Sequence, residues 1–375
     1  MNVVVLGAAG EVGKTLTADL AACPEIDHVV AADLARDEVE ALAAGRERVS
    51  AAPVNLRDRE QVLRLLDGCD LLVNCTSFSL FDVVIDLAVS AGIDYADLLS
   101  YPSQEQVRAV EESGITAISG LGLTPGLSNV LVAHAADELD EIEEAHIAWM
   151  SFRTIAPSRG LLDTILWELS EDCSTREYFQ NGRFHQAGPM EGSRLVDFAD
   201  PAGRQRVYFV PHTEVRTLPR HFPSLAFCAV RGTWRPKLMD DVRVLNEYGL
   251  LSQATLEATK EVVWDRFGGE RDVAPWMLFL NVEVVGTQDG ETVRRIYDVS
   301  HPTDWNQAAT GRMTGLCAAV GAQLLARHGR THAGFVDPEV YYDPHEFLVE
   351  LARREGVSVA RRDSILSGQP LERAT

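Results

Sequence analysis

The sequence predicts an α/β protein in which a doubly wound parallel sheet is interrupted by an inserted α+β domain. In the first third of the chain, short β-branched runs alternate with stretches whose apolar residues recur at three- and four-residue spacing. Repeated βα units require a parallel sheet with right-handed crossovers. Longer alternating strands then replace this pattern, and Trp305–His328 returns to helical spacing. We therefore assign residues 1–130 and 305–375 to one discontinuous domain and residues 131–304 to the inserted domain.

The strands of the parallel sheet are expected where β-branched runs are bounded by turn residues. They are Val3–Leu6, His28–Asp33, Arg48–Val54, Asp70–Cys75, Ile93–Leu98 and Ile115–Ser119. In the inserted domain, turn signals such as Asn181-Gly182 indicate hairpins and a mostly antiparallel sheet. Its expected strands are Ala145–Phe152, Arg206–Val210, Leu278–Val285 and Val293–Val299, and its helices are Leu161–Glu171, Lys237–Glu247 and Thr255–Phe267. After the helix His345–Glu355, residues 356–360 fit either an edge strand or a surface arm.

Composition and charge exclude several classes of protein. With 375 residues, 46% of them hydrophobic, the chain can bury a core in each of two domains. Its formal net charge of -22 opposes binding to nucleic acid or to anionic lipid. No apolar run approaches the ~20 residues of a membrane span, and the start of the chain does not resemble a signal peptide. We expect a cytoplasmic protein with reduced cysteines, no metal site, and no nucleic-acid or membrane partner.

A glycine-rich turn follows the first predicted strand. Gly7, Gly10 and Gly13 form a Gly-x-x-Gly-x-x-Gly motif that opens an amphipathic helix, as in Rossmann domains. The first glycine permits the tight turn, the second allows the backbone to approach a pyrophosphate, and the third allows the helix to pack on the strand. The helix N-terminus then offers N–H groups and a positive dipole. The expected cofactor-binding residues of this turn are Gly7, Ala9, Gly10, Glu11, Val12 and Gly13.

The end of the second strand indicates which dinucleotide is bound. Asp33 follows Gly13 by 20 residues (33 − 13), the offset expected for the acid that hydrogen-bonds the adenosine ribose. Its charge would repel a 2′-phosphate, so we expect NAD rather than NADP, although the nearby Arg36 is the residue type that accommodates NADP. Asn74, Thr76 and Ser77 end the fourth strand, where they would contact the cofactor or, equally well, cap the next helix.

Further motifs follow in an order that resembles a known family. They are Gly120-Leu-Gly122-Leu-Thr-Pro125-Gly126-Leu-Ser-Asn129, Thr217-Leu-Pro219 with Phe222-Pro223, Arg231-Gly232 before a helix, and Gly334-Phe-Val-Asp-Pro-Glu339 before Phe347-Leu348. Over nearly its full length the chain resembles the saccharopine dehydrogenase family, most closely its lysine 6-dehydrogenase-like members. The resemblance implies NAD(P)-linked chemistry at a carbon–nitrogen bond, and it adds Pro125, Gly126 and Asn129 to the expected cofactor residues.

The segment 208–217 is the expected wall of the substrate site. His212 is a candidate general base, Glu214 could hold an ammonium group, and Arg216 could hold a carboxylate. Thr217 follows them and is assigned to substrate binding as well. Lysine 6-dehydrogenases have a glycine-rich stretch at the matching place, so this chain departs from their pattern. The alternatives are a structural histidine and a surface ion pair between Glu214 and Arg216.

Three residues around the next predicted helix complete the expected site. Arg231, between an apolar strand and a glycine, suits an amino-acid carboxylate better than a lysine would. Trp234 could stack on nicotinamide or substrate, although a tryptophan of the core or of an interface is the commoner case. Lys237 is a third catalytic candidate and equally fits an exposed helix start.

The sequence thus predicts an NAD-dependent enzyme that oxidises the amine of a basic amino acid, such as lysine, to an imine or semialdehyde. The alternative enzyme couples an amine to a keto acid or semialdehyde by reduction, as saccharopine and carboxynorspermidine enzymes do. A nucleotide-binding protein without turnover is the alternative of another class. The long strands of the inserted domain lead us to expect a homodimer or larger homo-oligomer.

Overall fold

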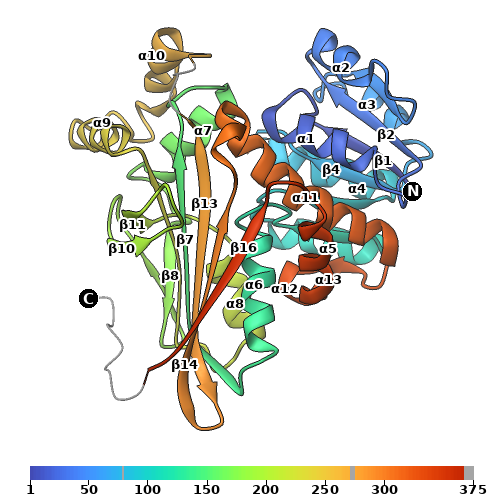
Figure 1. The fold of residues 1–375 in the computed structure, drawn as a ribbon. Helices are drawn as coiled ribbons and strands as arrows, with labels where there is room; N and C mark the ends of the chain where they lie inside the picture. Colours follow the sequence, from blue (N-terminus) through green and yellow to red (C-terminus); the bar gives the residue numbers. More distant parts are fainter. Residues whose placement is uncertain (78–79, 271–274, 367–375) are drawn as a thin grey trace. The chain divides into compact units, whose positions relative to one another are not determined.

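The computed structural model describes residues 1–77, 80–270 and 275–366, and the chain divides into two compact units (Figure 1). The first unit comprises Met1–Val130 and Thr310–Arg354, and the second comprises Leu131–Ala309 and the residues from Glu355 onward. Each unit is built around one sheet, parallel in the first and mixed in the second. The predicted fold class is therefore confirmed.

The sheet of the first unit is parallel throughout its described strands, in the order β15-β6-β5-β4-β1-β2-β3. Six strands match the prediction within a few residues: β1 (Asn2–Leu6), β2 (His28–Asp33), β3 (Val49–Pro53), β4 (Leu71–Asn74), β5 (Asp94–Asp97) and β6 (Thr116–Ser119). The seventh, β15 (Gly334–Phe335), comes from the C-terminal part of the chain and pairs with β6. At two residues it is too short to show a strand pattern in the sequence.

Helices connect these strands and bury the apolar sheet. They are α1 (Glu11–Leu20), α2 (Arg36–Ala43), α3 (Arg59–Leu66), α4 (Phe81–Ala91), α5 (Gln104–Ser113) and, from the C-terminal part, α11 (Ala309–His328), α12 (Pro338–Tyr341) and α13 (Pro344–Ala352). Glycines bring α11 close to α1, since a Cβ at Gly311 would lie 2.6 Å from the carbonyl oxygen of Glu11. Likewise, a Cβ at Gly315 would lie 2.7 Å from the Cβ of Thr15. The C-terminal part thus packs on the helix that follows the glycine loop.

The sheet of the second unit has the order β10-β11-β12-β7-β13-β14-β16, with the hairpin β8–β9 attached to β12. Its pairs are antiparallel, as predicted, except for the parallel pair β7–β12. The strands are β7 (Glu141–Phe152), β8 (Glu177–Gln180), β9 (Arg183–Gln186), β10 (Arg194–Asp197), β11 (Arg204–Phe209), β12 (Phe227–Trp234), β13 (Met277–Gln288), β14 (Glu291–Ser300) and β16 (Ser358–Ile365). The helices are α6 (Leu127–Ala136), α7 (Arg159–Glu168), α8 (Glu214–His221), α9 (Pro236–Glu247), α10 (Leu256–Phe267) and the short 3-10 helix Thr303–Ala308.

Alternation along β7 and β12 gives this sheet two distinct faces. Trp149 and Ser151 of β7 lie on one face together with Trp234 of β12, and we call this the Trp149 face. Met150 lies on the other face together with Arg231 of β12, and we call this the Met150 face. An apolar cluster that includes residues of β7, β11 and β13 packs around Met150. The register of the parallel pair β7–β12 therefore decides which predicted site residues share a face.

The last strand corrects the predicted domain boundary. The sequence assigns residues 305–375 to the first domain, but β16 pairs with β14 of the second sheet. The antiparallel ladder begins where Val293 is opposite Ile365 and ends where Ser300 is opposite Ser358. The chain from Glu355 onward consequently belongs to the second unit. Of the two alternatives for residues 356–360, the structure shows the edge strand. A second correction concerns α8, for which the sequence predicts no helix.

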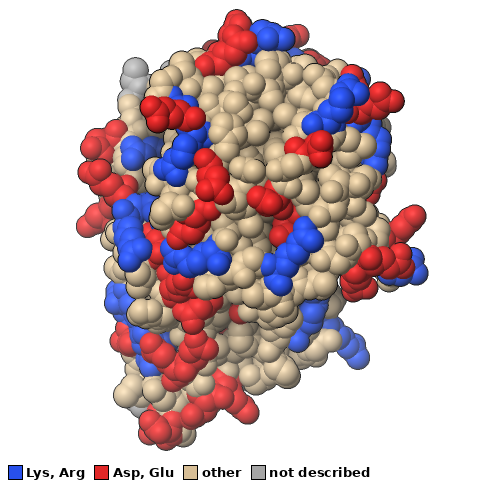
Figure 2. Space-filling model, turned by 90° about the vertical axis from the view of Figure 1, so that its right-hand side faces the viewer, with Lys and Arg blue, Asp and Glu red and all other residues tan. Residues whose placement is uncertain are grey.

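Charged side chains of both signs are interspersed on the surface. On the face drawn in Figure 2, Lys and Arg side chains lie beside Asp and Glu side chains. Exposed pairs such as Arg204 with Asp197 and Arg159 with Glu261 follow the same pattern. Among the described helices, none combines the length and the apolar character needed to cross a bilayer.

Candidate functional site

The glycine loop between β1 and α1 is packed so closely that only glycine fits at two of its three positions. Gly7 has a φ of +80°, and a Cβ there would lie 2.6 Å from the carbonyl oxygen of Cys75. A Cβ at Gly13 would lie 2.3 Å from the carbonyl oxygen of Gly7, so this glycine keeps α1 against β1. Gly10 is the N-cap of α1 and places no side chain over its first turn. This cradle fits a dinucleotide pyrophosphate at the positive end of α1. The other predicted residues of the loop are Ala9, Glu11 and Val12.

Asp33, at the end of β2, holds the glycine loop from the side. Its Oδ2 accepts a hydrogen bond from Ala9 N at 3.1 Å, and its Oδ1 accepts one from Ala35 N at 3.0 Å. Each carboxylate oxygen keeps a further lone pair for a ribose hydroxyl. Arg36 lies at the start of α2 and forms an exposed ion pair with Glu40 at 3.2 Å. The residues around the expected ribose position are therefore compatible with NAD.

A buried polar network occupies the carboxyl ends of β4, β5 and β6. Asn74 accepts hydrogen bonds from Thr76 N and Oγ1 at 3.0 and 2.7 Å, and its Nδ2 donates to Tyr95 Oη at 3.2 Å. Tyr95 Oη donates to Asp97 Oδ2 at 2.8 Å, and Ser119 Oγ donates to Asp97 Oδ1 at 2.9 Å. The network fixes the loop after β4, whose backbone closes over Gly7.

Asp97 is the charged member of this network, and the sequence prediction missed it. Burial raises the pKa of Asp97 to about 6. Hydrogen bonds from Tyr95 and Ser119 favour the carboxylate and act in the opposite direction. Its place at a strand end could have identified it, because the carboxyl edge of a doubly wound sheet is where ligands bind. Ser77 also lies in the loop after β4, and its carbonyl accepts a hydrogen bond from Leu80 N just before α4. The loop residues thus have structural partners, and their contacts to a cofactor stay predictions.

The turn between β6 and α6 is closed by its own residues. Gly126 has a φ of +127°, and a Cβ there would lie 2.3 Å from the carbonyl oxygen of Gly122. Asn129 accepts a hydrogen bond from Gly126 N at 3.0 Å and donates to Glu339 Oε2 at 2.8 Å. Pro125 contributes its carbonyl to Gly122 N at 2.9 Å. This motif therefore ties the turn to the C-terminal part of the first unit, and a role in cofactor binding stays a prediction.

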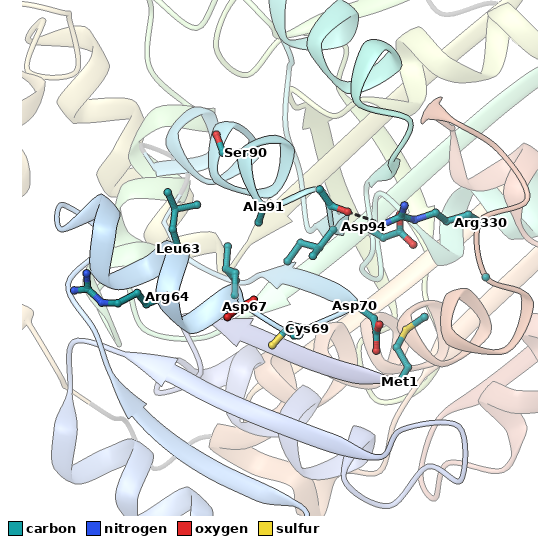
Figure 3. Close-up of a pocket in the computed structure, with 15 residues that line it drawn as sticks. Met1, Leu63, Arg64, Asp67, Cys69, Asp70, Ser90, Ala91, Asp94 and Arg330 are labelled. Atoms are coloured by element: carbon teal, nitrogen blue, oxygen red, sulfur yellow. Dashed lines mark hydrogen bonds and ion pairs between the residues drawn. The ribbon is translucent and has the colours of Figure 1, made fainter.

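A cavity of about 770 Å³ lies at the opposite edge of the first sheet (Figure 3). Asp70 and Asp94 line it where β4 and β5 begin, and Arg330 closes one side through an ion pair with Asp94 at 2.7 Å. Dinucleotides bind at the carboxyl ends of the strands. This cavity faces the amino ends and is therefore distinct from the glycine loop.

In the second unit, His212 lies between two buried carboxylates. It precedes α8 and is 7% exposed. Its Nε2 lies 3.9 Å from Glu168 Oε1 at the end of α7, and its Nδ1 lies 3.8 Å from Glu214 Oε2 at the start of α8. Both glutamates are almost completely buried. We call these three residues the His212 cluster.

The charges of the cluster change the titration of the imidazole. Burial by itself would lower the pKa of His212, but the negative charges of Glu168 and Glu214 outweigh it, so the pKa is raised above its usual value. An imidazolium is therefore favoured over a wider pH range than in a solvated histidine. An imidazole beside two carboxylates can both donate and accept a proton.

Two tryptophans of the Trp149 face cover the cluster. The Trp149 ring stacks on the His212 ring with centroids 6.0 Å apart, and Trp234 meets Trp149 edge-on at 4.8 Å. Gly232 makes this possible, because a Cβ there would lie 2.3 Å from the Trp149 ring. Within the described residues, Trp149 Nε1, Ser151 Oγ and Glu168 Oε2 are buried without a hydrogen-bond partner. Such atoms can accept or donate a hydrogen bond to a water or a ligand.

Arg231 does not lie with His212, contrary to the predicted site. Its side chain points to the Met150 face, where Nε donates to Gly192 O at 2.7 Å and the guanidinium lies over the Phe209 ring at 4.5 Å. Burial lowers the pKa of Arg231 to about 9. The sequence shows the strand but not its register, and the register of β12 on β7 separates the two residues.

The remaining predicted residues have different surroundings. Arg216 is half-exposed and pairs with Glu177 at 2.8 Å, while Thr217 is buried one position later in α8. Lys237 is 85% exposed and pairs with Asp241 at 2.7 Å, which fits the exposed helix start rather than a catalytic group. The sequence prediction missed Glu168 and Trp149, because neither stands near His212 in the chain.

A parallel sheet with a glycine cradle and a strand-end aspartate defines the first unit as a dinucleotide-binding domain of Rossmann type. Residues 3–118 match the family model described as the saccharopine dehydrogenase NADP binding domain, and residues 122–357 match the saccharopine dehydrogenase C-terminal domain. The chain belongs to the saccharopine dehydrogenase family and is an NAD(P)-dependent oxidoreductase. The resemblance to this family found in the sequence is confirmed.

Similar proteins have low sequence identity, and their coverage ranges from about half of the chain to nearly all of it. Carboxyaminopropylagmatine dehydrogenase of Synechocystis sp. is 22% identical, over 93% of this chain and 95% of its own length. Carboxynorspermidine synthase of Vibrio alginolyticus is 25% identical over 55% of this chain and 54% of its own length. Among solved structures, apo saccharopine dehydrogenase (L-Glu forming) of Saccharomyces cerevisiae has a TM-score of 0.73 at 15% identity, covering 97% of this chain and 99% of that one. Homospermidine synthase of Legionella pneumophila in complex with NAD has a TM-score of 0.63 at 16% identity, covering 99% and 94%. The structural matches support the same fold.

Proposed function

We propose that this enzyme joins an amine to a carbonyl compound by reducing the imine between them, or runs the same reaction in reverse. The observation that carries the proposal is the buried His212 between Glu168 and Glu214, which can hold a cationic nitrogen and exchange its proton. The names of the relatives support it, since carboxyaminopropylagmatine, carboxynorspermidine, saccharopine and homospermidine are all amines.

The chemistry assigns a role to each group of the His212 cluster. Condensation of an amine with a carbonyl releases water and gives an imine. Bound NAD(P)H would supply a hydride to the imine carbon. His212 donates a proton to the nitrogen of the imine during reduction and removes a proton from the amine in the reverse reaction, which suits its raised pKa. Glu168 and Glu214 stabilise positive charge there, and Trp149 with Trp234 limits the access of water.

A second candidate is the oxidation of the amine of a basic amino acid such as lysine. The buried carboxylates of Glu168 and Glu214 favour this oxidation, because they can also hold the ammonium group of a substrate that has no carbonyl partner. The same residues would act, with His212 as the base.

Nicotinamide absorbance distinguishes these candidates. We expect oxidation of NADH or NADPH when an amine and a carbonyl compound are supplied together, and none with either alone. Reduction of NAD by lysine without coupling activity would instead support the second candidate. Tight NADH binding without turnover on any pair or amino acid would contradict both enzyme proposals.

We further propose that NAD is preferred over NADP, because Asp33 stands where the ribose is expected and the nearby Arg36 is paired with Glu40. Asp33→Ala should cost about 1.5–3 kcal/mol of NAD affinity, the value of a charge-assisted hydrogen bond. Asp33→Asn keeps an acceptor for Ala9 N and therefore isolates the effect of the charge. Asp37→Ala removes a neighbouring negative charge on α2 and serves as the control. Fluorescence titration that showed tighter NADP binding to the unaltered enzyme would refute this preference. The homo-oligomer and the cytoplasmic location stay predictions.

A further inference from the structure

We propose that Arg153 binds the carboxylate of the substrate, in the role that the sequence assigns to Arg231. This inference rests on the proposed function and narrows its substrate to an amine that also carries a carboxylate. Arg153 follows the last residue of β7, and its Nη2 donates to the carbonyl of Leu161 in α7, the helix that ends at Glu168 of the His212 cluster. It is 3% exposed.

The hydrogen bonds of Arg153 leave two N–H groups of its guanidinium for a ligand. Nη1 donates to the carbonyls of Thr154 and Ile155 at 2.9 and 3.3 Å, and Nη2 donates to the carbonyl of Leu161 at 3.0 Å. Three of the five N–H groups are thereby used. Nε–H and one N–H of Nη2 remain, and these two donors are available to the oxygens of a carboxylate.

No carboxylate of the described residues lies within ion-pair distance of Arg153. Burial lowers the pKa of Arg153 to about 10, and only the charge of Glu168 acts in the opposite direction. A buried cation is costly without a counter-ion. A substrate carboxylate would supply that charge.

The residues between Arg153 and the His212 cluster indicate the shape of the ligand. Trp149 Nε1 and Ser151 Oγ lie on the Trp149 face and are buried without partners among the described residues. We therefore place the substrate nitrogen at His212 and its carboxylate at Arg153, with the Trp149 and Ser151 side chains between them.

A second buried arginine provides the matched control. Arg176 is completely buried and also bonds to carbonyls, but there Nε donates to Ala187 O at 3.0 Å, and Nη1 and Nη2 donate to the carbonyls of Glu168 and Ser170. Its side-on edge is therefore occupied by protein. A loss of stability should be common to variants of Arg153 and Arg176, whereas a loss of carboxylate recognition should be specific to Arg153.

The test compares L-lysine with cadaverine, which lacks the carboxylate, by calorimetric titration of the NAD-saturated enzyme. We expect the unaltered enzyme to bind L-lysine more tightly than cadaverine. R153Q should weaken L-lysine binding by 10- to 100-fold and change cadaverine binding less than 3-fold, as a lost charge-assisted pair requires. R153K keeps the positive charge but not the guanidinium, so it should weaken L-lysine binding less than R153Q does. It replaces R153Q in the test if R153Q does not fold.

Three results would overturn the role of Arg153. They are equal binding of L-lysine and cadaverine by the unaltered enzyme, equal weakening of both by R153Q and R153K, and a selective loss of L-lysine in R176Q or R231Q. These binding results are independent of turnover. A failure of all turnover assays would refute the proposed reaction while the titrations still decide whether Arg153 recognises a carboxylate.

Discussion

The two faces of the second sheet bury charge in opposite ways. On the Trp149 face, the His212 imidazole lies between two glutamates that raise its pKa. On the Met150 face, Arg231 lies over an aromatic ring and bonds to a backbone carbonyl, and burial lowers its pKa. The surroundings of His212 allow its imidazole to gain and lose a proton, while those of Arg231 hold a permanent cation within the fold. Burial of a charged group thus says little about catalysis until its partners are known.

The largest effect is expected from the residue that distinguishes the Trp149 face. His212→Ala should lower kcat by ~10²–10⁴-fold, as the loss of an acid–base group does, and remove one limb of the pH profile. Steady-state kinetics across pH would measure both. If the profile were unchanged, His212 would be a structural histidine and the contrast between the faces would disappear.

Arg231 should affect stability in place of catalysis. Arg231→Ala removes the contact with Phe209 and leaves the carbonyl of Gly192 without its donor, so we expect the free energy of unfolding to fall by about 2–4 kcal/mol. The midpoint of urea denaturation would report it. In the folded variant, KM and the pH profile should match those of the unaltered enzyme. A raised KM with unchanged stability would return Arg231 to the substrate site.

Glu168→Gln tests whether the charge of Glu168 raises the pKa of His212. Removing this negative charge should lower the pKa of His212, so the corresponding limb of the pH profile moves to lower pH. The sign for stability follows from linkage. A raised folded-state pKa stabilises the protein below the unfolded pKa of about 6.5, and this contribution is lost as the pH rises through the folded value. The variant should therefore lose stability mainly at low pH, and Glu177→Gln, near the surface, serves as control.

The smallest effect is expected at Lys237, which lies on neither face. Its ammonium is exposed and pairs with Asp241 within one turn of α9. Lys237→Ala should leave kcat, KM and the melting temperature almost unchanged, because such surface pairs contribute little. A large loss of kcat would revive Lys237 as the catalytic base.

The sequence predicts best what is local in the chain. The glycine loop and Asp33 were identifiable because their roles depend on spacing within one βα unit. His212 and Glu214 are two residues apart and were found together, whereas Glu168 is 44 residues before His212 (212 − 168) and joins it only through the packing of α7. The sequence places Arg231 in one site with His212, but the register of β12 turns its side chain to the Met150 face, and a shift of one residue would reverse that direction.

The last two pairings of the chain have a consequence for how the protein folds during synthesis. The first sheet receives β15 from residues 334–335, and the second receives β16 from residues 358–365. A nascent chain that ends before these strands leaves both sheets with an exposed edge, at β6 and at β14. Each sheet can complete its hydrogen bonding only after its own last strand has emerged from the ribosome, β15 first and β16 shortly after it. Maturation of the two units is therefore expected to be nearly simultaneous and late, despite the early position of the nucleotide loop.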